Sequence, residues 1–187
     1  MREKVLVNRI IISTQMANLG FEKNWNNLGG ILFRTEVGDK FIFEAIKNKK
    51  AVLGGEQSGH ILSEINNFCG DGILTAIQIS KFCKKKKISL TSWFRTSFIP
   101  YPQKLSNIGL NFDYKKISNS NKNYLNETID KLSINKNKDC RIYIRPSGTE
   151  PVLRILVEAE SLTMVDHLSR KITSELQTKI NQLSKHF

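Results

Sequence analysis

The sequence predicts an α/β domain with mostly parallel strands, followed by a smaller α+β domain. Over the first half of the chain, short apolar runs alternate with helix-like segments, an order typical of α/β layers. Two prolines within residues 97–102 then form a stiff connector. The last part combines two apolar strands around a polar loop with one long amphipathic helix. We therefore expect one domain over residues 1–96 and a second over residues 97–187.

Three apolar runs are the predicted strands of the first domain. They lie at residues 5–13, 31–35 and 51–53. The intervening helices are expected at residues 14–28, ended by Gly29 and Gly30, and after residues 37–40, which lead into a helix with Phe41, Ala45 and Ile46 on one face. Ligands of such layers collect at the carboxyl ends of the strands. The loops that follow the second and third strands are therefore the expected places for a site.

A further helix is predicted after the segment Gly-Asp-Gly at residues 70–72, beyond an exposed turn at Asn66 and Asn67. Asp71 suits the N-terminal turn of a helix, and residues 73–80 keep one face at i, i+3, i+4, i+7 spacing. The same segment suggests a metal loop, but one carboxylate is too few for a magnesium site, so we favour the cap. Lysines 84–87 are expected to end this helix, where cations oppose the helix dipole.

The second domain is predicted to contain two strands and two helices that cover one face of the sheet. The strands, at residues 141–144 and 153–157, flank the polar loop at residues 145–151. Residues 119–123 and 134–139 are expected to be polar connections, with a helix between them from about residue 124 to residue 132.

The final helix has the clearest periodicity in the chain. Its apolar stripe consists of Val165, Leu168, Ile172, Leu176, Ile180 and Leu183. Thr163 and Asp166 resemble a capping box at its start. Packing against a small sheet explains this stripe better than a coiled coil with a partner.

The composition limits the classes of function. The chain has 187 residues, a formal net charge of +12 and 40% hydrophobic residues, which suffice for a globular core. A high positive charge suggests nucleic-acid binding. Here, however, the lysines are spread among many asparagines, and aromatic residues are not interleaved with them. We therefore expect no specific nucleic-acid binding.

Cysteines, histidines and apolar runs point away from disulfides, zinc and membranes. Cys69, Cys83 and Cys140 are odd in number and scattered, as expected of reduced structural thiols. The histidines lack metal-ligand spacing, so no zinc site is expected. No apolar run approaches the roughly 20 residues needed to span a bilayer. We expect a soluble, cytoplasmic protein with no membrane partner.

The polar loop at residues 145–151, Arg-Pro-Ser-Gly-Thr-Glu-Pro, has the composition of an anion cradle. Pro146 holds Arg145 in an extended conformation, so its guanidinium leaves the strand end in a fixed direction. Hydroxyls, close backbone N–H groups and a second guanidinium complete the set of phosphate-binding groups. These candidates are Arg145, Ser147, Gly148, Thr149 and Arg154. The alternative is a hairpin connection in which Ser, Gly and Pro are only turn residues.

A second motif, Gly-Gly-Glu-Gln-Ser-Gly-His, lies upstream at residues 54–60. Glu56, Ser58 and His60 can hydrogen-bond adjacent sugar hydroxyls, while the glycines leave room for a ring. Together and in this order, the two motifs resemble the sugar-binding and phosphate-binding loops of the α-D-phosphohexomutase family, in the form of its phosphoglucosamine mutase branch.

The resemblance implies a fold and a set of roles. The chain would comprise a partial α/β third domain of a phosphohexomutase and its small α+β fourth, C-terminal domain. Glu56 and Ser58 would hold the hydroxyls of a hexosamine phosphate, and the 145–154 segment would hold its phosphate. His60 either assists in proton handling or is a structural histidine bonded to backbone. Lys40 stands where many relatives have arginine, which keeps the charge but loses the planar fork.

The resemblance also implies a reaction, the interconversion of glucosamine 6-phosphate and glucosamine 1-phosphate for amino-sugar and cell-wall precursor synthesis. In the family, an enzyme phosphoserine exchanges its phosphoryl group through a bisphosphorylated sugar, with Mg²⁺ at the phosphoserine. The family's phosphoserine loop and Asp-Gly-Asp metal loop are not found in this sequence. We therefore expect a C-terminal portion that binds no metal through its own residues and is inactive alone. It would act with a separately encoded N-terminal portion, or be a decaying fragment.

Two alternatives remain open at this point. The chain can be a non-enzymatic sugar-phosphate binding or assembly module that reuses this domain pair. It can also belong to a phosphomannomutase or a phosphoglucomutase, because Glu56 and Ser58 address hydroxyls common to several hexoses.

Overall fold

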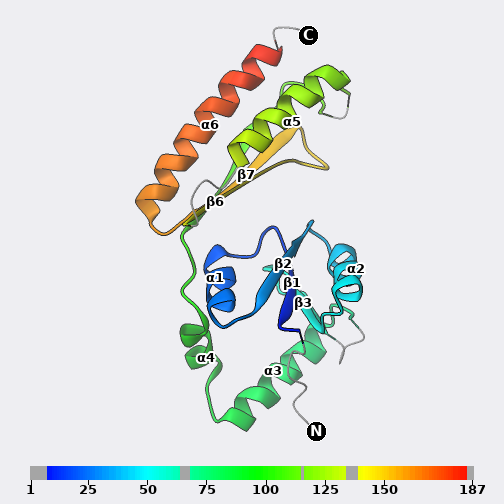
Figure 1. Cartoon of the computed structure of the whole chain (residues 1–187), viewed down its shortest axis with the longest axis vertical. Helices are drawn as coiled ribbons and strands as arrows, with labels where there is room; N and C mark the ends of the chain where they lie inside the picture. The colour runs from blue at the N-terminus through cyan, green and yellow to red at the C-terminus, as the bar shows by residue number, and fades with distance from the viewer. Residues whose placement is uncertain (1–7, 64–67, 115, 134–138, 185–187) are drawn as a thin grey trace. The chain divides into compact units, whose positions relative to one another are not determined.

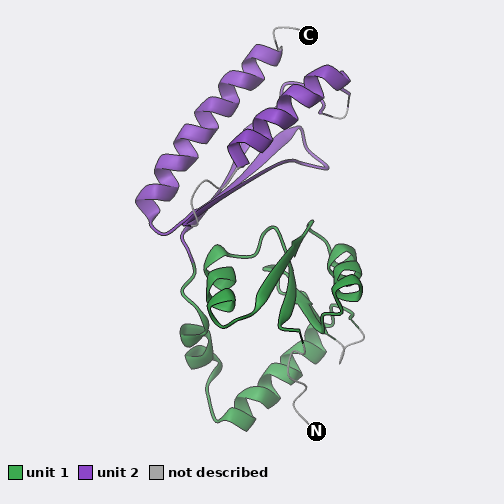
Figure 2. Ribbon diagram, viewed as in Figure 1, with its two compact units in different colours: residues 1–100 green, residues 101–187 purple. Residues whose placement is uncertain are grey.

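The computed structural model describes residues 8–63, 68–114, 116–133 and 139–184. The predicted turn at Asn66 and Asn67, the start of the first predicted strand and most of the connection at residues 134–139 lie outside these ranges. The chain forms two compact units, Met1–Pro100 and Tyr101–Phe187 (Figure 2).

The first unit is built on a four-stranded sheet with the order β2-β1-β3-β4. Its strands are β1 (Ile10–Thr14), β2 (Ile31–Thr35), β3 (Leu53–Gly55) and β4 (Ile61–Ser63). Strand β1 runs parallel to β2 and β3, and β4 pairs antiparallel with β3. Its helices are α1 (Leu19–Asn27), α2 (Asp39–Lys49), α3 (Gly72–Lys86) and α4 (Leu90–Ser97). Helices α1 and α2 lie on opposite faces of the sheet (Figure 1).

Close packing of α2 on the sheet explains one glycine of the second motif. Ile12 of β1 is paired with Gly54 of β3 and is fully buried together with Ile42 of α2. A Cβ added to Gly54 would lie 2.5 Å from Cγ2 of Ile42, which is too close for any side chain. Position 54 therefore requires glycine, because α2 packs too closely against β3 there to leave room for a side chain.

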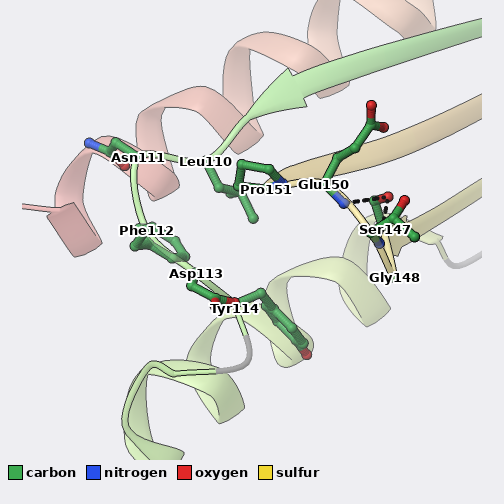
Figure 3. A pocket seen from close by; sticks show the side chains of 10 residues that line it. Leu110, Asn111, Phe112, Asp113, Tyr114, Ser147, Gly148, Glu150 and Pro151 are labelled. Carbon is green, nitrogen blue, oxygen red and sulfur yellow. Dashed lines mark hydrogen bonds between the residues drawn. The ribbon is translucent and has the colours of Figure 1, made fainter.

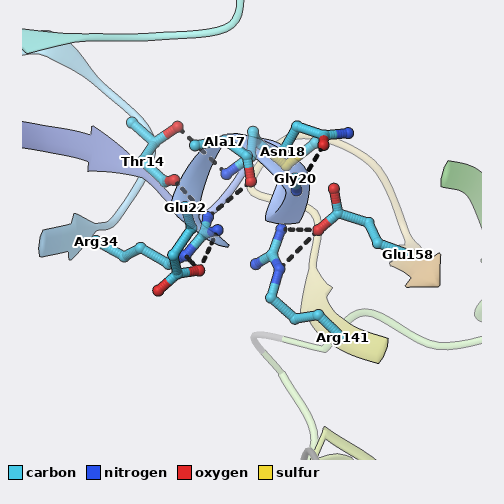
Figure 4. Close-up of polar contacts among 9 residues, drawn as sticks. Thr14, Ala17, Asn18, Gly20, Glu22, Arg34, Arg141 and Glu158 are labelled. Carbon is cyan, nitrogen blue, oxygen red and sulfur yellow. Dashed lines mark hydrogen bonds and ion pairs between the residues drawn. The ribbon is translucent and has the colours of Figure 1, made fainter. Parts of the chain in front are cut away.

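An ion pair ties α1 to the other face of the sheet. The guanidinium of Arg34 in β2 donates to Oε2 of Glu22 in α1, with N–O distances of 2.7 and 3.1 Å (Figure 4). It also donates to the carbonyl of Ala17 at 2.8 Å. The helix begins directly after Asn18, whose side chain accepts from the N–H of Gly20.

Three element boundaries in this unit differ from the prediction. Strand β1 begins at Ile10, although residues 8 and 9 were predicted to belong to it, because Arg9 has a φ of +52°, which is not an extended conformation. Helix α1 begins at Leu19 and not at residue 14, because Thr14 is the last residue of β1 and Asn18 is the N-cap. The third strand covers residues 53–55 and not 51–53, since Ala51 instead donates its N–H to Ile46 at the end of α2.

Helix α3 confirms the predicted cap but not the predicted burial. The side chain of Asp71 accepts from the N–H of Leu74 at 2.8 Å, and the lysine run ends the helix as expected. Ile73 and Ile77 on the predicted apolar face are exposed, and Thr75 is the buried residue of the helix. Helical spacing indicated the helix correctly, but it did not show which face is covered.

The second unit is a three-stranded antiparallel sheet with the order β5-β7-β6. Its elements are β5 (Gln103–Gly109), α5 (Asn119–Ser133), β6 (Cys140–Pro146), β7 (Val152–Ala159) and α6 (Leu162–Ser184). Helices α5 and α6 pack on the same face of the sheet around one apolar core (Figure 1). The predicted α+β arrangement is confirmed, with β5 as an additional strand that the sequence analysis did not assign.

Both helices of this unit begin elsewhere than predicted. Helix α5 begins at Asn119, within the predicted polar connection, after Ser118, whose hydroxyl lies 3.4 Å from the N–H of Asn121. The cap of α6 is Ser161, whose hydroxyl accepts from the N–H of Met164 at 3.2 Å, and not the predicted Thr163. The predicted apolar stripe of α6 is confirmed, because its residues are buried or partly buried in the core.

The face of the sheet opposite α5 and α6 carries charged residues. Arg141 and Glu158 are directly paired across β6 and β7, and Nη2 of Arg141 lies 2.6 Å from Oε2 of Glu158 (Figure 4). Both side chains are buried, so each charge depends on the other.

In the described residues, no helix is long and apolar enough to span a bilayer.

Candidate functional site

The motif at residues 54–60 forms a tight hairpin between β3 and β4. The N–H of Glu56 donates to the carbonyl of His60 at 2.8 Å, and the N–H of Gly59 donates to the carbonyl of Glu56 at 3.0 Å. Gly59 has a φ of +101°, a conformation that side-chain-bearing residues rarely adopt. The hairpin thus presents Glu56, Ser58 and His60 from one short turn.

Glu56 connects this hairpin to the start of α2. Its Oε1 accepts the backbone N–H of Gly38 at 2.8 Å, and its Oε2 accepts the hydroxyl of Ser58 at 3.0 Å. The two loops follow β2 and β3, which run parallel to β1 on either side of it, so both loops lie at the carboxyl end of the parallel strands, as expected for an α/β layer. Glu56 is half-buried and Ser58 is exposed. The structure therefore brings these two predicted residues together at the carboxyl end of β3.

His60 pairs with Asp39, a residue that the sequence analysis did not single out. Nδ1 of His60 lies 3.0 Å from both carboxylate oxygens of Asp39, the first residue of α2. Among the described residues, the imidazole therefore bonds to a side chain and not to backbone. The hydrogen bond to Asp39 and the negative charge of Asp39 raise the pKa of His60, and Glu56 adds a smaller contribution in the same direction.

Lys40 follows Asp39 and is exposed. Its Nζ lies 4.6 Å from the centroid of the Phe41 ring, an arrangement in which the ring stabilises the cation. The structure thus places a positive charge one residue from the Asp39–His60 pair.

Three residues of this unit could hold a metal ion by residue type. Asp39, Glu56 and His60 place their ligand atoms within 4.8 Å of one another. In this arrangement Asp39 already bonds His60, while Glu56 accepts from Gly38 and Ser58. A hard cation such as Mg²⁺ demands about six oxygen ligands in near-ideal octahedral geometry. The cluster offers two carboxylates and an imidazole that are already bonded to neighbours, so it fits Mg²⁺ poorly.

The polar loop at residues 145–151 forms the turn between β6 and β7 in the other unit. The N–H of Ser147 donates to the carbonyl of Val152 at 2.9 Å and closes the turn. The hydroxyl of Ser147 accepts weakly from the N–H groups of Thr149 and Glu150, at 3.4 and 3.3 Å. Gly148 and Thr149 at the tip are exposed. The turn therefore exposes small residues and hydroxyls at the end of the sheet.

Two arginines stand directly opposite each other below this turn. Arg145 of β6 is paired with Arg154 of β7, and the neighbours Leu153 and Ile155 of β7 belong to the core under α5 and α6. Because side chains alternate along a strand, both guanidinium groups project from the opposite face of the sheet. Like charges in directly opposite positions destabilise a sheet unless an anion lies between them.

The two arginines differ in their partners. Nη2 of Arg154 lies 3.0 Å from Oε2 of Glu150, while its Nε is buried and has no hydrogen-bond partner among the described residues. Within the described residues, Arg145 forms no ion pair. The local excess of positive charge and the unmade hydrogen bonds are features of an anion site.

A pocket of about 530 Å³ lies beside the same turn, but the arginines do not line it. Figure 3 shows residues 110–114 facing the turn of residues 147–151 across this space. The N–H of Leu110 donates to the carbonyl of Pro151 at 2.7 Å and joins the two segments. The hydroxyl of Tyr114 donates to Asn126 of α5 at 2.6 Å. The turn thus has two accessible sides, one with the pocket and one with the two arginines.

An α/β unit with this hairpin and an α+β unit with this turn form the pair of domains that the resemblance to the phosphohexomutases predicts. The chain belongs to the phosphoglucomutase/phosphomannomutase family. The family model of α/β/α domain III matches residues 1–101, and that of the C-terminal domain matches residues 113–174. The predicted family and fold class are confirmed.

Curated relatives refine this result. A phosphoglucosamine mutase of Prochlorococcus marinus (strain MIT 9515) is 70% identical over all of this chain, which covers 41% of that protein. A phosphoglucosamine mutase of a Synechococcus species is 40% identical over 96% of the chain and 39% of its own length. The chain therefore spans about two fifths of the length of these relatives.

Solved structures agree on the fold. An N-acetylphosphoglucosamine mutase of Aspergillus fumigatus has a TM-score of 0.71 at 20% identity, over 91% of this chain and 39% of its own. A structure of an N-acetylglucosamine-phosphate mutase in its substrate complex has a TM-score of 0.68 at 20% identity, over 89% of this chain and 38% of its own. A further structure of the Aspergillus enzyme contains GlcNAc-6P and magnesium.

Proposed function

We propose that this chain supplies the sugar-binding and phosphate-binding parts of a cytoplasmic phosphoglucosamine mutase. Such an enzyme interconverts glucosamine 6-phosphate and glucosamine 1-phosphate for amino-sugar and cell-wall precursor synthesis. The observation that carries the proposal is the cross-strand pair of Arg145 and Arg154 beside an exposed Ser-Gly-Thr turn. The identity of 70% to a phosphoglucosamine mutase favours this branch of the family.

The arginine turn suits a phosphate that is held and not transferred. Two guanidinium groups on one face of a sheet can each donate two N–H groups to phosphate oxygens. The hydroxyls of Ser147 and Thr149 and the backbone of Gly148 supply further donors from the turn. This arrangement binds a phosphate by its charge and shape without regard to the rest of the ligand. A mutase needs this tolerance, since either phosphate of its bisphosphate intermediate must occupy the site.

The hairpin of the first unit suits sugar hydroxyls. The carboxylate of Glu56 is oriented by Gly38 and Ser58 and retains further acceptor capacity at both oxygens. Ser58 is exposed and can exchange its bond to Glu56 for a bond to a ligand hydroxyl. Glu56 and Ser58 would thus position the sugar ring, and Lys40 would add positive charge near its reacting end.

His60 is suited to donate a proton. Asp39 occupies Nδ1, which leaves Nε2 to face a ligand. Because the pKa of His60 is raised, a larger fraction of the imidazole carries a proton at neutral pH than in a free histidine. We propose that His60 donates a hydrogen bond, and where required a proton, to an oxygen of the bound sugar phosphate.

The phosphoserine and its metal are proposed to come from residues outside this sequence. Mg²⁺ would stabilise negative charge at the phosphoryl group in transfer. The poor fit of the Asp39, Glu56 and His60 cluster to Mg²⁺ supports assignment of the metal to another part of the enzyme. The present chain would bind and orient the substrate and be inactive alone.

A complementation assay tests this proposal. The N-terminal part of the Prochlorococcus marinus relative, without the segment that matches this chain, would be mixed with the purified 187-residue chain. We expect conversion of glucosamine 6-phosphate only when both are present, and a loss with Arg145→Ala. As a positive control, the relative's own C-terminal segment should restore activity. Turnover by the 187-residue chain alone would contradict the binding-only role. An inactive mixture alongside an active positive control would contradict the proposed enzyme function.

A further inference from the structure

The carboxylate of Glu150 is bonded to the guanidinium of Arg154, which in the proposed function binds the phosphate of a ligand. Its Oε2 accepts from Nη2 of Arg154 at 3.0 Å. The side chains of Arg154 and Glu150 are 39% and 58% exposed, so a dissolved anion can reach the pair. Glu150 is also the only acidic residue in the turn of residues 145–151. A negative side chain inside an anion-binding turn therefore needs an explanation.

Part of the explanation is the positive charge of the two arginines. Arg145 and Arg154 face each other across β6 and β7, and Nε of Arg154 has no partner in the part of the chain that the structure describes. Without an anion, this pair of like charges raises the free energy of the sheet. The carboxylate of Glu150 offsets part of this repulsion by taking the position of one ligand oxygen. It can do so at the usual geometry of a charge-assisted hydrogen bond.

The backbone of Glu150 allows its carboxylate to leave without disturbing the turn. Its N–H donates to the hydroxyl of Ser147 at 3.3 Å, and its carbonyl accepts from Val152 at 2.8 Å. These bonds hold the main chain, whereas the side chain is held only at its tip in the contacts of the described residues. A rotation about side-chain bonds would suffice to free Arg154, and such rotations are fast in exposed residues.

We propose that Glu150 is an internal competitor for Arg154, which a phosphate monoester displaces on binding. This inference rests on the proposed function, because it assumes that the arginine turn binds phosphate. The competition lowers the affinity of the turn for phosphate and favours its release. It also favours dianions, since a doubly charged phosphate outcompetes a carboxylate for guanidinium more readily than a singly charged ligand does.

The variant Glu150→Gln tests the inference, because it removes the charge and keeps the shape of the side chain. Titration calorimetry of the full chain with inorganic phosphate, at pH 7.5 and low salt, would give the dissociation constants. We expect Glu150→Gln to bind phosphate about threefold to tenfold more tightly than the wild type. The gain should shrink as salt is added, because both side chains are exposed.

The matched control is Asp166→Asn. Asp166 pairs with Lys104 at 2.8 Å, and the two side chains are 46% and 47% exposed. Lys104 lies near the end of β5 that is remote from the turn, since it is paired with Val157 while Gly109 is paired with Val152. The control therefore makes the same change in charge in the same unit, and we expect it to leave the phosphate affinity unchanged.

The outcomes separate the inference from the proposed function. Binding of phosphate by the wild type with equal or weaker binding by Glu150→Gln would overturn the inference and leave the proposed function intact. An equal gain in Asp166→Asn would also overturn it, because the effect would then be one of net charge. If the folded wild type and Glu150→Gln both failed to bind phosphate or glucosamine 6-phosphate, the phosphate-binding role itself would be wrong.

Discussion

At the scale of single residues, the properties of the site depend on contacts between side chains that lie far apart in the sequence. His60 was selected from its motif, but its partner Asp39 lies 21 positions away and was not. No local pattern joins the two residues. They meet because the loop after β2 and the hairpin after β3 lie at the same edge of a parallel sheet. The sequence could predict that edge but not the contact.

The Asp39–His60 pair has a measurable consequence for titration. Asp39 stabilises the imidazolium form, so Asp39→Asn should lower the pKa of His60 toward its ordinary value. An NMR titration of the imidazole resonances would measure this shift. The wild type, titrated under the same conditions, is the control. An unchanged His60 titration in Asp39→Asn would contradict the pairing.

The same shift determines how the pair affects stability with pH. The pKa of His60 is raised in the folded state, so the folded state binds the proton more tightly than the unfolded state. The stabilisation is therefore fully present below the unfolded pKa and is lost as the pH rises through the folded pKa. The pair thus favours the folded state on the acidic side of the histidine titration.

At the scale of the elements, the sequence predicted best where one strong period dominated. The stripe on α6 is an example, because six apolar residues at helical spacing left no alternative. The start of α1 was predicted too early, at residue 14. The N-cap is Asn18, and the sequence pattern of residues 14–18 did not show that the helix begins only after it. Strand β5 was overlooked because exposed polar residues such as Lys104 and Asn107 interrupt its apolar positions. It forms because β7 supplies its hydrogen bonds.

A pair of substitutions in α6 tests the packing of the second unit. Leu176 is fully buried, whereas Leu162 at the start of the same helix is 69% exposed. We expect Leu176→Ala to lower the free energy of unfolding by about 2–5 kcal/mol, through lost burial and a cavity. Leu162→Ala should change it by no more than about 0.5 kcal/mol. Chemical denaturation followed by circular dichroism would measure both, and equal losses would show that the stripe does not form the core.

At the scale of the whole molecule, the order of the two motifs was more informative than either motif alone. Their resemblance predicted the family, which the match to domain III over residues 1–101 then established. It did not predict that the pocket beside the phosphate turn and the two arginines lie on different sides of that turn. This detail follows from the alternation of β7, in which Arg154 stands between two core residues.

The central claim is that the paired arginines hold the phosphate of a hexosamine phosphate. Its most direct test is the affinity of the full chain for glucosamine 6-phosphate, measured by calorimetry in the wild type, Arg154→Lys and Arg170→Lys. Arg154→Lys keeps the charge but loses the planar fork, and should bind about tenfold more weakly. Arg170 is exposed on α6, and its lysine variant should match the wild type. Glucosamine without phosphate should bind far more weakly than its 6-phosphate. Equal affinities of the wild type and Arg154→Lys, or of glucosamine and its phosphate, would contradict the account.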